Sequence, residues 1–191
     1  MSRCFVIAVL FAATLTPFAL AQNGPKDAVV LIIRHAEDAD TGHGISANGH
    51  GRAEAYKDYF LNFTVHSKRL EPNVLLAARD SQKSHRPRLT LEPFAKAANL
   101  KIDTRFGNNQ SAELVADLRA NDQGKVILIC WRHGNIPALL SAFGATPKSF
   151  LPNGKWPGSV YNWIIILSFD QNGRLIPTES RRINEHLIPG D

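Results

Sequence analysis

Cysteine is scarce in this chain of 191 residues, which has only Cys4 and Cys130. Cys4 lies in an apolar N-terminal leader that we expect to be removed, so Cys130 remains alone and no internal disulfide is expected. Cys130 sits inside an apolar run, where a single cysteine more often packs as a small hydrophobic residue than acts as a nucleophile. The sequence therefore excludes a disulfide-stapled scaffold and does not favour thiol chemistry.

The positive charge of the chain is mild and dispersed. The formal net charge is +5, or +4 without Arg3 of the leader, and no run of basic residues alternates with aromatic ones. Nucleic-acid-binding proteins usually carry a basic patch or stripe, so the sequence indicates no nucleic-acid partner. A small positive excess suits an anionic small-molecule substrate instead. The chain also lacks internal repeats and low-complexity segments.

Residues 1–21 have the pattern of a secretory signal peptide. A positive start, Met1-Ser2-Arg3, precedes the apolar run 4–18, and Ala19-Leu20-Ala21 is a small-x-small cleavage site. A transmembrane anchor is the alternative, but the apolar run is short for a membrane span and contains Pro17. We therefore predict cleavage after the leader, an exported protein that is periplasmic or secreted, and no integral membrane span after cleavage.

Apolar runs alternate with helical patterns in residues 22–191, which we predict to form one domain. The runs 28–33, 73–78 and 126–131 are typical of strands buried on both faces. Apolar residues between and after them recur with the spacing of one helical face: Tyr56, Tyr59, Phe60 and Phe63; Leu91, Phe94, Ala95 and Ala98; Leu114, Val115 and Leu118; Ile136, Leu139, Leu140 and Phe143. This order predicts an α/β fold, a three-layer α/β/α sandwich with a mainly parallel central sheet.

The C-terminal part of the chain has the signals of a hairpin. An apolar stretch at 160–169 precedes the turn Asp170-Gln171-Asn172-Gly173. We predict that the turn leads into a short antiparallel edge strand at 174–178.

Two of the predicted central strands end in an arginine followed by a histidine, Arg34-His35 and Arg132-His133. Because the carboxyl ends of parallel strands share one edge of a sheet, both histidines are expected over the same crevice. The segment Arg86-Pro87 opens a helix, since proline is favoured at the first helical position. We expect the arginine of this segment to enter the same edge.

These side chains are suited to phosphoryl transfer. Guanidinium groups bind phosphate oxygens through paired hydrogen bonds, and helix N-termini add free backbone N–H groups. A neutral imidazole whose second nitrogen is held by an acceptor is a competent nucleophile near neutral pH. We therefore predict that His35 attacks phosphorus and forms a phosphohistidine, which water hydrolyses. Arg34, Arg86 and His133 would stabilise the charge on the phosphoryl oxygens.

The same residues resemble motifs of the histidine phosphatase superfamily, the phosphoglycerate mutase-like proteins. Arg34-His35-Ala36-Glu37 is similar to the Arg-His-Gly-Glu signature of that family. Further similarities are Ser46-Ala47-Asn48-Gly49 with Arg52-Ala53, which resembles the opening of the family's first helix; Arg86 before Leu89-Thr90-Leu91, its second arginine; and His133-Gly134, its second histidine. The resemblance covers about residues 28–169. It implies a phosphoglycerate mutase-like fold, catalytic roles for Arg34, His35, Arg86 and His133, and no metal or cofactor.

The chain departs from the family pattern beside the second histidine and at the general acid. Trp131-Arg132 precede His133 where the family usually has small residues, and Gly134-Asn135 follow where its larger branch has an acid. Another branch carries a glutamate after the second arginine, which makes Glu113 our candidate acid, although Glu113 also fits an exposed charge on a helix at 110–121. Small members of the family lack a strong acid, which suits leaving groups such as those of phosphoramidates.

Two other functions fit parts of the pattern. A metal-dependent hydrolase could draw on the acids and histidines near the first strand, namely Glu37, Asp38, Asp40, His43 and His50. Their spacing lacks the His-x-x-x-His pattern of a helical zinc site and fits a solvated loop more simply. A non-catalytic phosphate- or anion-binding protein would use the same pocket as the phosphatase. Activity in EDTA tests the first alternative, and trapping of a phosphoenzyme tests the second.

The substrate is predicted only as a class. No large insertion that could form a cap domain separates the strands, so we expect an open pocket. Export argues against a glycolytic mutase and favours a phosphorylated small molecule or an external or envelope phosphate. We expect Trp131, Trp156 and Trp163 to belong to the core rather than to line a cleft.

Overall fold

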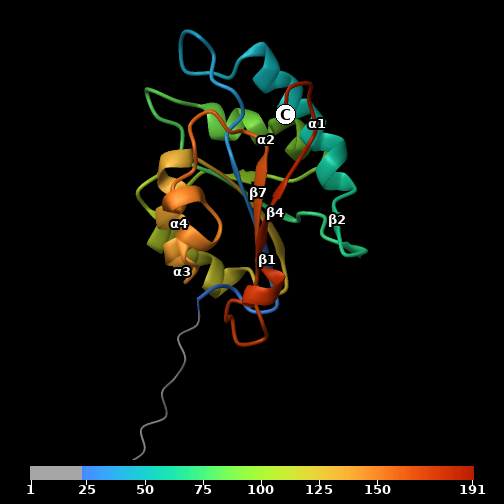
Figure 1. Cartoon of the computed structure of the whole chain (residues 1–191), viewed down its shortest axis with the longest axis vertical. Coiled ribbons are helices and arrows are strands. Elements are labelled where there is room, and N and C mark those ends of the chain that lie inside the picture. Colours follow the sequence, from blue (N-terminus) through green and yellow to red (C-terminus); the bar gives the residue numbers. More distant parts are fainter. Residues whose placement is uncertain (1–22) are drawn as a thin grey trace, which may run out of the picture.

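A central sheet organises the molecule (Figure 1). It has six strands in the order β5-β4-β6-β1-β7-β8. This computed structural model describes residues 23–191, so the predicted signal peptide lies outside the described residues. The strands are β1 (Val29–Arg34), β4 (Val74–Ala77), β5 (Ile102–Asp103), β6 (Val126–Trp131), β7 (Trp163–Ser168) and β8 (Arg181–Asn184). A small separate hairpin pairs β2 (Thr64–Val65) with β3 (Lys68–Arg69).

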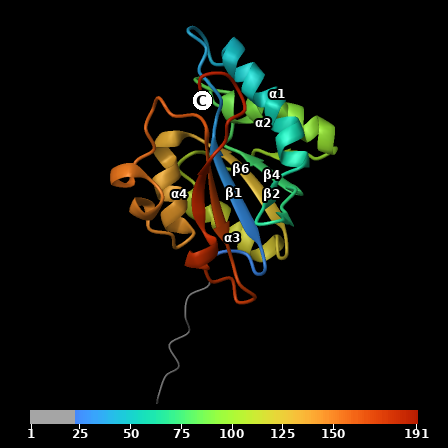
Figure 2. The same ribbon diagram turned by 45° about the vertical axis from the view of Figure 1, so that its right-hand side comes forward.

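Helices cover both faces of the sheet and complete a three-layer sandwich (Figure 2). One face carries α1 (Ala47–Leu61) and α2 (Arg86–Ala98), and the other carries α3 (Ser111–Asn121) and α4 (Ile136–Ala142). Short 3-10 helices are η1 (His133–Asn135), η2 (Pro147–Ser149), η3 (Pro152–Gly154) and η4 (Pro177–Glu179). Within residues 23–191, no helix has the length and apolar character needed to cross a membrane.

The opening strand β1 is buried on both faces, as its uniformly apolar sequence predicts. Val30 and Ile32 pack with the α3 and α4 side chains, whereas Leu31 and Ile33 pack with those of α1 and α2. This alternation follows from the two-residue period of a strand. All four side chains are fully buried, so β1 anchors the two layers of the core to each other.

The pairing of the strands confirms the predicted fold class. β1, β4, β5 and β6 are parallel, and β7 runs antiparallel to both β1 and β8. In the register between β1 and β6, Arg34 lies opposite Trp131. The residues that follow these two strands, His35 and Arg132-His133, therefore leave the sheet side by side at one edge.

The predicted C-terminal hairpin exists, but the bounds that we predicted for its second strand are wrong. The Asp170 carboxylate accepts hydrogen bonds from the backbone N–H groups of Asn172 and Arg174, at 2.7 and 2.9 Å, and closes the expected turn. The chain then makes only one isolated bridge, between Phe169 and Leu175, before Pro177 opens η4. Since proline has no N–H to donate to a ladder, continuous pairing resumes only in β8.

Candidate active site

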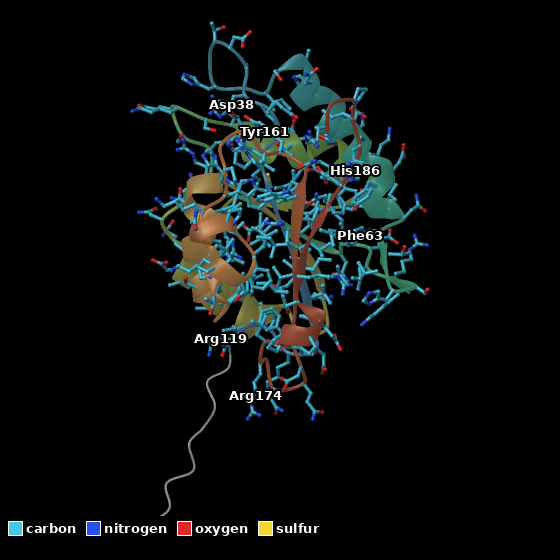
Figure 3. All side chains as sticks on the ribbon, viewed as in Figure 1. Asp38, Phe63, Arg119, Tyr161, Arg174 and His186 are labelled. Carbon is cyan, nitrogen blue, oxygen red and sulfur yellow. The ribbon has the colours of Figure 1, made fainter. Side chains whose placement is uncertain are left out.

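Two histidines meet at the carboxyl edge of the sheet, as the sequence predicts. The ring centroids of His35 and His133 are 6.3 Å apart, and their planes make an angle of 65°. Figure 3 shows Asp38 and Tyr161, two neighbours of this site, at one end of the molecule, with Arg119 and Arg174 at the opposite end. The site therefore occupies one end of the sandwich.

His35 is held in one tautomer. Its side chain is buried, and Nδ1 lies 2.8 Å from the carbonyl oxygen of Ala36. Because a carbonyl oxygen only accepts hydrogen bonds, Nδ1 of the neutral ring must donate, which leaves the lone pair on Nε2. Burial, the largest cause, lowers the pKa of His35 to about 4. The imidazole is therefore neutral at pH 7, in the form that a nucleophile requires.

Arg34 is a buried cation without an ionic partner. It is the last residue of β1, and only 1% of its surface is exposed. Its Nη1 donates to the carbonyl oxygens of Gly158 and Val160 at 2.7 and 3.2 Å, and the guanidinium lies 3.7 Å from the centroid of the Tyr161 ring. Among residues 23–191, no carboxylate forms an ion pair with Arg34, and Nε has no hydrogen-bond partner. Burial lowers the pKa of this guanidinium.

Arg86 reaches the same edge from the first residue of α2. Its Nε donates to the carbonyl oxygen of Gly44 at 3.0 Å and forms an ion pair with Asp38 at 3.2 Å. Thr90 ties this end of α2 to the loop of the first histidine. Its hydroxyl donates to the Arg86 carbonyl at 2.8 Å and accepts from the Ala36 N–H at 2.9 Å. The second arginine and the first histidine are thus fixed relative to each other.

His133 begins η1, directly after β6. It is half-buried, and its Nδ1 is a buried atom with no hydrogen-bond partner among the described residues. A side chain at Gly158 would bring its Cβ to 3.9 Å from Nε2, so this nitrogen faces the loop that Arg34 holds. Burial, followed by the charge of Arg34, lowers the pKa of His133. The second imidazole is therefore also neutral at pH 7 and can donate one hydrogen bond.

The other predicted candidates lie in different surroundings. Glu113 is exposed in the first turn of α3, and no contact found within residues 23–191 joins it to Arg34, His35, Arg86 or His133. Its role as an acid stays a prediction. The acids and histidines of the loop after β1 do not converge on a common point. In the described part of the chain, no three His, Cys, Asp or Glu side chains are arranged to hold a metal ion.

The loop before β7 supplies part of the site that the sequence analysis missed. The carbonyl of Val160 accepts hydrogen bonds from Arg34 and, at 2.8 Å, from the indole N–H of Trp156. Because residue 160 belongs to this loop, β7 begins at Trp163 rather than at residue 160. All three tryptophans are buried, which confirms their expected place in the core. The only sequence signal for this loop is its high content of proline and glycine.

A buried ionic network lies behind the site and was also missed. Arg52 of α1 forms ion pairs with Glu37, Glu185 and Asp191 at 2.6, 2.9 and 2.5 Å. The hydroxyl of Tyr56 donates to Glu185 at 2.6 Å. The network joins the loop after the first histidine to α1 and to the segment after β8. Glu37 and Arg52 are both residues of the motifs described above, but their pairing cannot be read from spacing.

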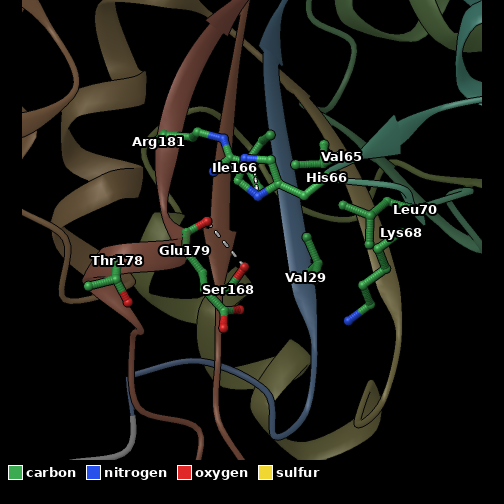
Figure 4. Close-up of a pocket in the computed structure, with 10 residues that line it drawn as sticks. All are labelled: Val29, Val65, His66, Lys68, Leu70, Ile166, Ser168, Thr178, Glu179 and Arg181. Carbon is green, nitrogen blue, oxygen red and sulfur yellow. Dashed lines mark hydrogen bonds between the residues drawn. The ribbon is translucent and has the colours of Figure 1, made fainter.

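A cavity of about 310 Å³ lies at the opposite end of the strands, between the β2–β3 hairpin and β8 (Figure 4). Its lining includes Val29, the first residue of β1, and Arg181, whose Nη2 lies 3.4 Å from Nδ1 of His66. Val29 and Arg34 are separated by the length of β1, on the order of 17 Å at the usual rise per residue. This cavity is therefore not part of the paired-histidine site.

Comparison with known proteins identifies the overall fold. No protein-family model matches the sequence, and no curated protein matches it. Three similar solved structures are phosphoserine phosphatase from Entamoeba histolytica with 3-phosphoglyceric acid, the protein histidine phosphatase SixA with tungstate, and mycobacterial glucosyl-3-phosphoglycerate phosphatase with inorganic phosphate.

The similarity extends over most of each chain at low sequence identity. The respective identities are 13%, 14% and 14%, and the TM-scores are 0.53, 0.52 and 0.51. The alignments cover 83%, 82% and 83% of this chain and 98%, 96% and 95% of the others. All three are members of the histidine phosphatase superfamily. The predicted phosphoglycerate mutase-like fold is confirmed.

Proposed function

We propose that this chain, which has the fold of the histidine phosphatase superfamily, hydrolyses phosphomonoesters or phosphoramidates through a phosphohistidine on His35. The observation that carries the proposal is the contrast between two neighbouring side chains. The lone pair of His35 is directed to Nε2 by the hydrogen bond at Nδ1, and Arg34 beside it is a buried cation without a carboxylate. A bound phosphate would supply the missing negative charge to the arginine and present phosphorus to the imidazole.

In the first half-reaction, Nε2 of His35 forms a bond to phosphorus. The bond between phosphorus and the leaving group breaks, and its electron pair goes to the leaving oxygen or nitrogen. Arg34, Arg86 and His133 would donate hydrogen bonds to the phosphoryl oxygens, where charge accumulates in the transition state. The two guanidiniums supply the positive charge that other phosphoryl-transfer sites obtain from metal ions, so we propose a metal-independent reaction.

In the second half-reaction, water attacks phosphorus and the phosphorus–nitrogen bond breaks. The electron pair returns to Nε2, inorganic phosphate leaves, and the water proton remains with the phosphate. Because the imidazole is neutral again at pH 7, the enzyme is ready for another turnover.

The leaving group sets the range of substrates. We propose substrates whose leaving group needs no proton from the enzyme: phosphoramidates, whose basic nitrogen takes its proton from water and leaves as a neutral amine, or esters whose leaving oxygen is already a weak base. The exposed position of Glu113 fits this preference, because the residue makes no contact with the paired histidines. If Glu113 does act as an acid, its removal will slow the hydrolysis of alkyl phosphates much more than that of aryl phosphates.

The decisive experiment is a phosphatase panel in the presence of EDTA, with a trapped phosphoenzyme as the second readout. We expect phosphate release and an acid-labile, base-stable label on the wild-type protein, and neither in His35→Ala. His43→Ala is the matched control, because His43 is exposed in the adjacent loop. Tight phosphate binding without any label would instead support a non-catalytic anion-binding protein. Activity that EDTA abolishes would contradict the metal-independent reaction.

We also propose that the protein is exported and acts on an external or envelope phosphate. The support is the leader pattern of residues 1–21. Mass spectrometry of the protein from the culture fluid and the cell envelope tests this, and we expect a mature N-terminus at Gln22. A protein that keeps Met1 inside the cell would contradict it.

A further inference from the structure

Asp38 lies beside both the first histidine and the second arginine of the site. Its Oδ1 lies 3.3 Å from Nδ1 of His35 and 3.2 Å from Nε of Arg86. The side chain is 46% exposed, so one oxygen faces these partners while the residue borders solvent. The backbone of the loop is closed separately, by the bridge between Asp38 and Ile45.

We propose that Asp38 is a positioning residue: its ion pair with Arg86 keeps the carboxylate beside Nδ1 of His35, where it compensates the positive charge that develops on the ring during phosphoryl transfer. This inference rests on the function proposed above and adds a residue to it. Asp38 acts through the nucleophile, and it does not touch the phosphoryl group itself.

The need for compensation follows from the charge balance of the first half-reaction. When Nε2 forms its bond to phosphorus, the ring still carries the proton on Nδ1 and becomes a cationic phosphoimidazole. Nδ1 points to the Ala36 carbonyl at 2.8 Å and to the Asp38 carboxylate at 3.3 Å. The carbonyl is a dipole, whereas the carboxylate is a full negative charge, so Asp38 supplies the larger share of compensation.

The surroundings of His35 make this charge important. Arg34 and Arg86 both disfavour a cationic ring at this position, and the neighbouring His133 ring is neutral. Asp38 and the Ala36 carbonyl are the groups that favour it. Without Asp38, a phosphohistidine would form between two guanidiniums with only a backbone carbonyl to oppose them.

The proposal predicts opposite effects on the two half-reactions. A less stable cationic phosphoimidazole forms more slowly. It also loses its phosphoryl group to water more readily, because that step turns the unfavourable cation back into a neutral imidazole. In Asp38→Asn, we expect His35 phosphorylation to slow by about tenfold to a hundredfold and phosphoenzyme hydrolysis to quicken by a few-fold. A loss of loop structure alone would slow both steps.

Rapid-quench measurements with a labelled aryl phosphate test these expectations. Asp40→Asn is the matched control, because Asp40 is an exposed carboxylate two residues further along the loop and forms no ion pair among residues 23–191. We expect both its rates to stay within about twofold of the wild-type rates. Asp38→Glu keeps the negative charge, so its phosphoenzyme should be hydrolysed about as slowly as that of the wild type. This variant keeps the proposal testable even if Asp38→Asn folds poorly.

The outcomes separate the inference from the proposed function. If the wild type forms a phosphoenzyme and Asp38→Asn behaves like Asp40→Asn, the role of Asp38 is refuted and the phosphatase stands. Equal slowing of both half-reactions in Asp38→Asn also refutes it, since it shows only a structural contribution. If the wild type forms no phosphoenzyme with any substrate, the proposed function fails and the inference fails with it.

Discussion

Arg34 and Arg52 are both almost fully buried, with 1% and 2% of their surfaces exposed, yet their surroundings have opposite character. Arg52 is encircled by three carboxylates. Arg34 has two backbone carbonyls, an aromatic face and an unpartnered Nε. Burial lowers the pKa of both, but hydrogen bonds to Glu37 and Asp191 outweigh burial at Arg52 and raise its pKa, whereas at Arg34 the pKa stays lowered.

The difference fits a structural role for Arg52 and the phosphate-binding role that we propose for Arg34. Taking a guanidinium out of water is costly, and folded proteins normally offset the cost with a nearby carboxylate. Arg52 is offset in this way within the chain. Arg34 contacts only neutral groups, and the carboxylates of Asp38 and Glu37 act on it from a distance without forming an ion pair. We propose that an anion bound at the paired histidines completes the offset.

Arg52→Met should have the largest effect on stability. The substitution leaves Glu37, Glu185 and Asp191 close together in a mostly buried site without their cation. Breaking one side of a buried ionic network typically costs about 3–5 kcal/mol. Denaturant unfolding measures the loss. A loss below about 1 kcal/mol would mean that the three carboxylates find other compensation.

Arg34→Met should have the opposite balance of effects, a small loss of stability and a large loss of activity. The substitution removes a buried cation that makes no ion pair, so we expect a smaller loss of stability than in Arg52→Met, limited to the contacts of Arg34 with the loop before β7. Activity should fall by about a hundredfold or more, equivalent to ~3 kcal/mol of transition-state stabilisation. Steady-state kinetics and unfolding of the same preparation give both numbers.

The same variant has a predicted effect on pH dependence. The charge of Arg34 is one cause of the low pKa of His35, so its removal should raise that pKa from about 4. The acidic fall of kcat/KM should then move to higher pH in Arg34→Met. It should not move in a folded Arg52 variant, and an equal movement in both would contradict the contrast between the two arginines.

Glu185→Gln should change the pH dependence of stability around Arg52. Burial, the largest cause, raises the pKa of Glu185 to about 7. The folded state therefore binds more protons than the unfolded state between pH about 4.5 and 7, and the wild type loses stability as the pH rises through that window. The loss is on the order of 3 kcal/mol. Glutamine cannot titrate, so the slope should flatten.

The geometry suits this substitution. Oε1 of Glu185 accepts the hydrogen bonds from Arg52 and Tyr56, and Oε2 has no partner, so an amide can replace the carboxylate without losing either bond. Glu179→Gln, at an exposed glutamate, is the control and should leave the slope unchanged. Asp191 has a lowered pKa, so its contribution is lost only at lower pH.

The contrast between the arginines also shows what the sequence could predict. The sequence predicts four candidate site residues, because each ends or follows an apolar strand or opens a helix, and strand register then fixes their position. They are Arg34, His35, Arg86 and His133. The sandwich itself follows from the alternation of apolar runs and helical faces. These are features of local pattern, which a single chain displays directly.

The remaining parts of the site depend on contacts between distant segments. Glu185 lies 133 residues after Arg52, and Gly158 lies 124 residues after Arg34. No spacing links such pairs. Asp38 is near the first histidine in sequence, but only the fold brings Arg86 to its other side. The predicted bounds of the edge strand were wrong for a related reason. Pro177 interrupts pairing with β7, and only the fold shows that pairing resumes at β8.

Substitutions at two glycines, one near each arginine, should have the smallest effects. At Gly49, near the Arg52 network, an added Cβ would lie 2.7 Å from the carbonyl oxygen of Glu37, which is too close for any carbon. At Gly158, near Arg34, an added Cβ would meet only Nε2 of His133, at 3.9 Å, an ordinary contact.

Gly49→Ala should therefore destabilise the fold by about 1–3 kcal/mol through overpacking, as measured by thermal or denaturant unfolding. Gly158→Ala should leave stability unchanged and alter KM for a bulky substrate by only a few-fold, because its methyl group narrows the space beside the second histidine. If Gly158→Ala instead unfolds the protein while Gly49→Ala does not, the loop at Arg34 is part of the rigid frame and the segment at Arg52 is the adaptable one.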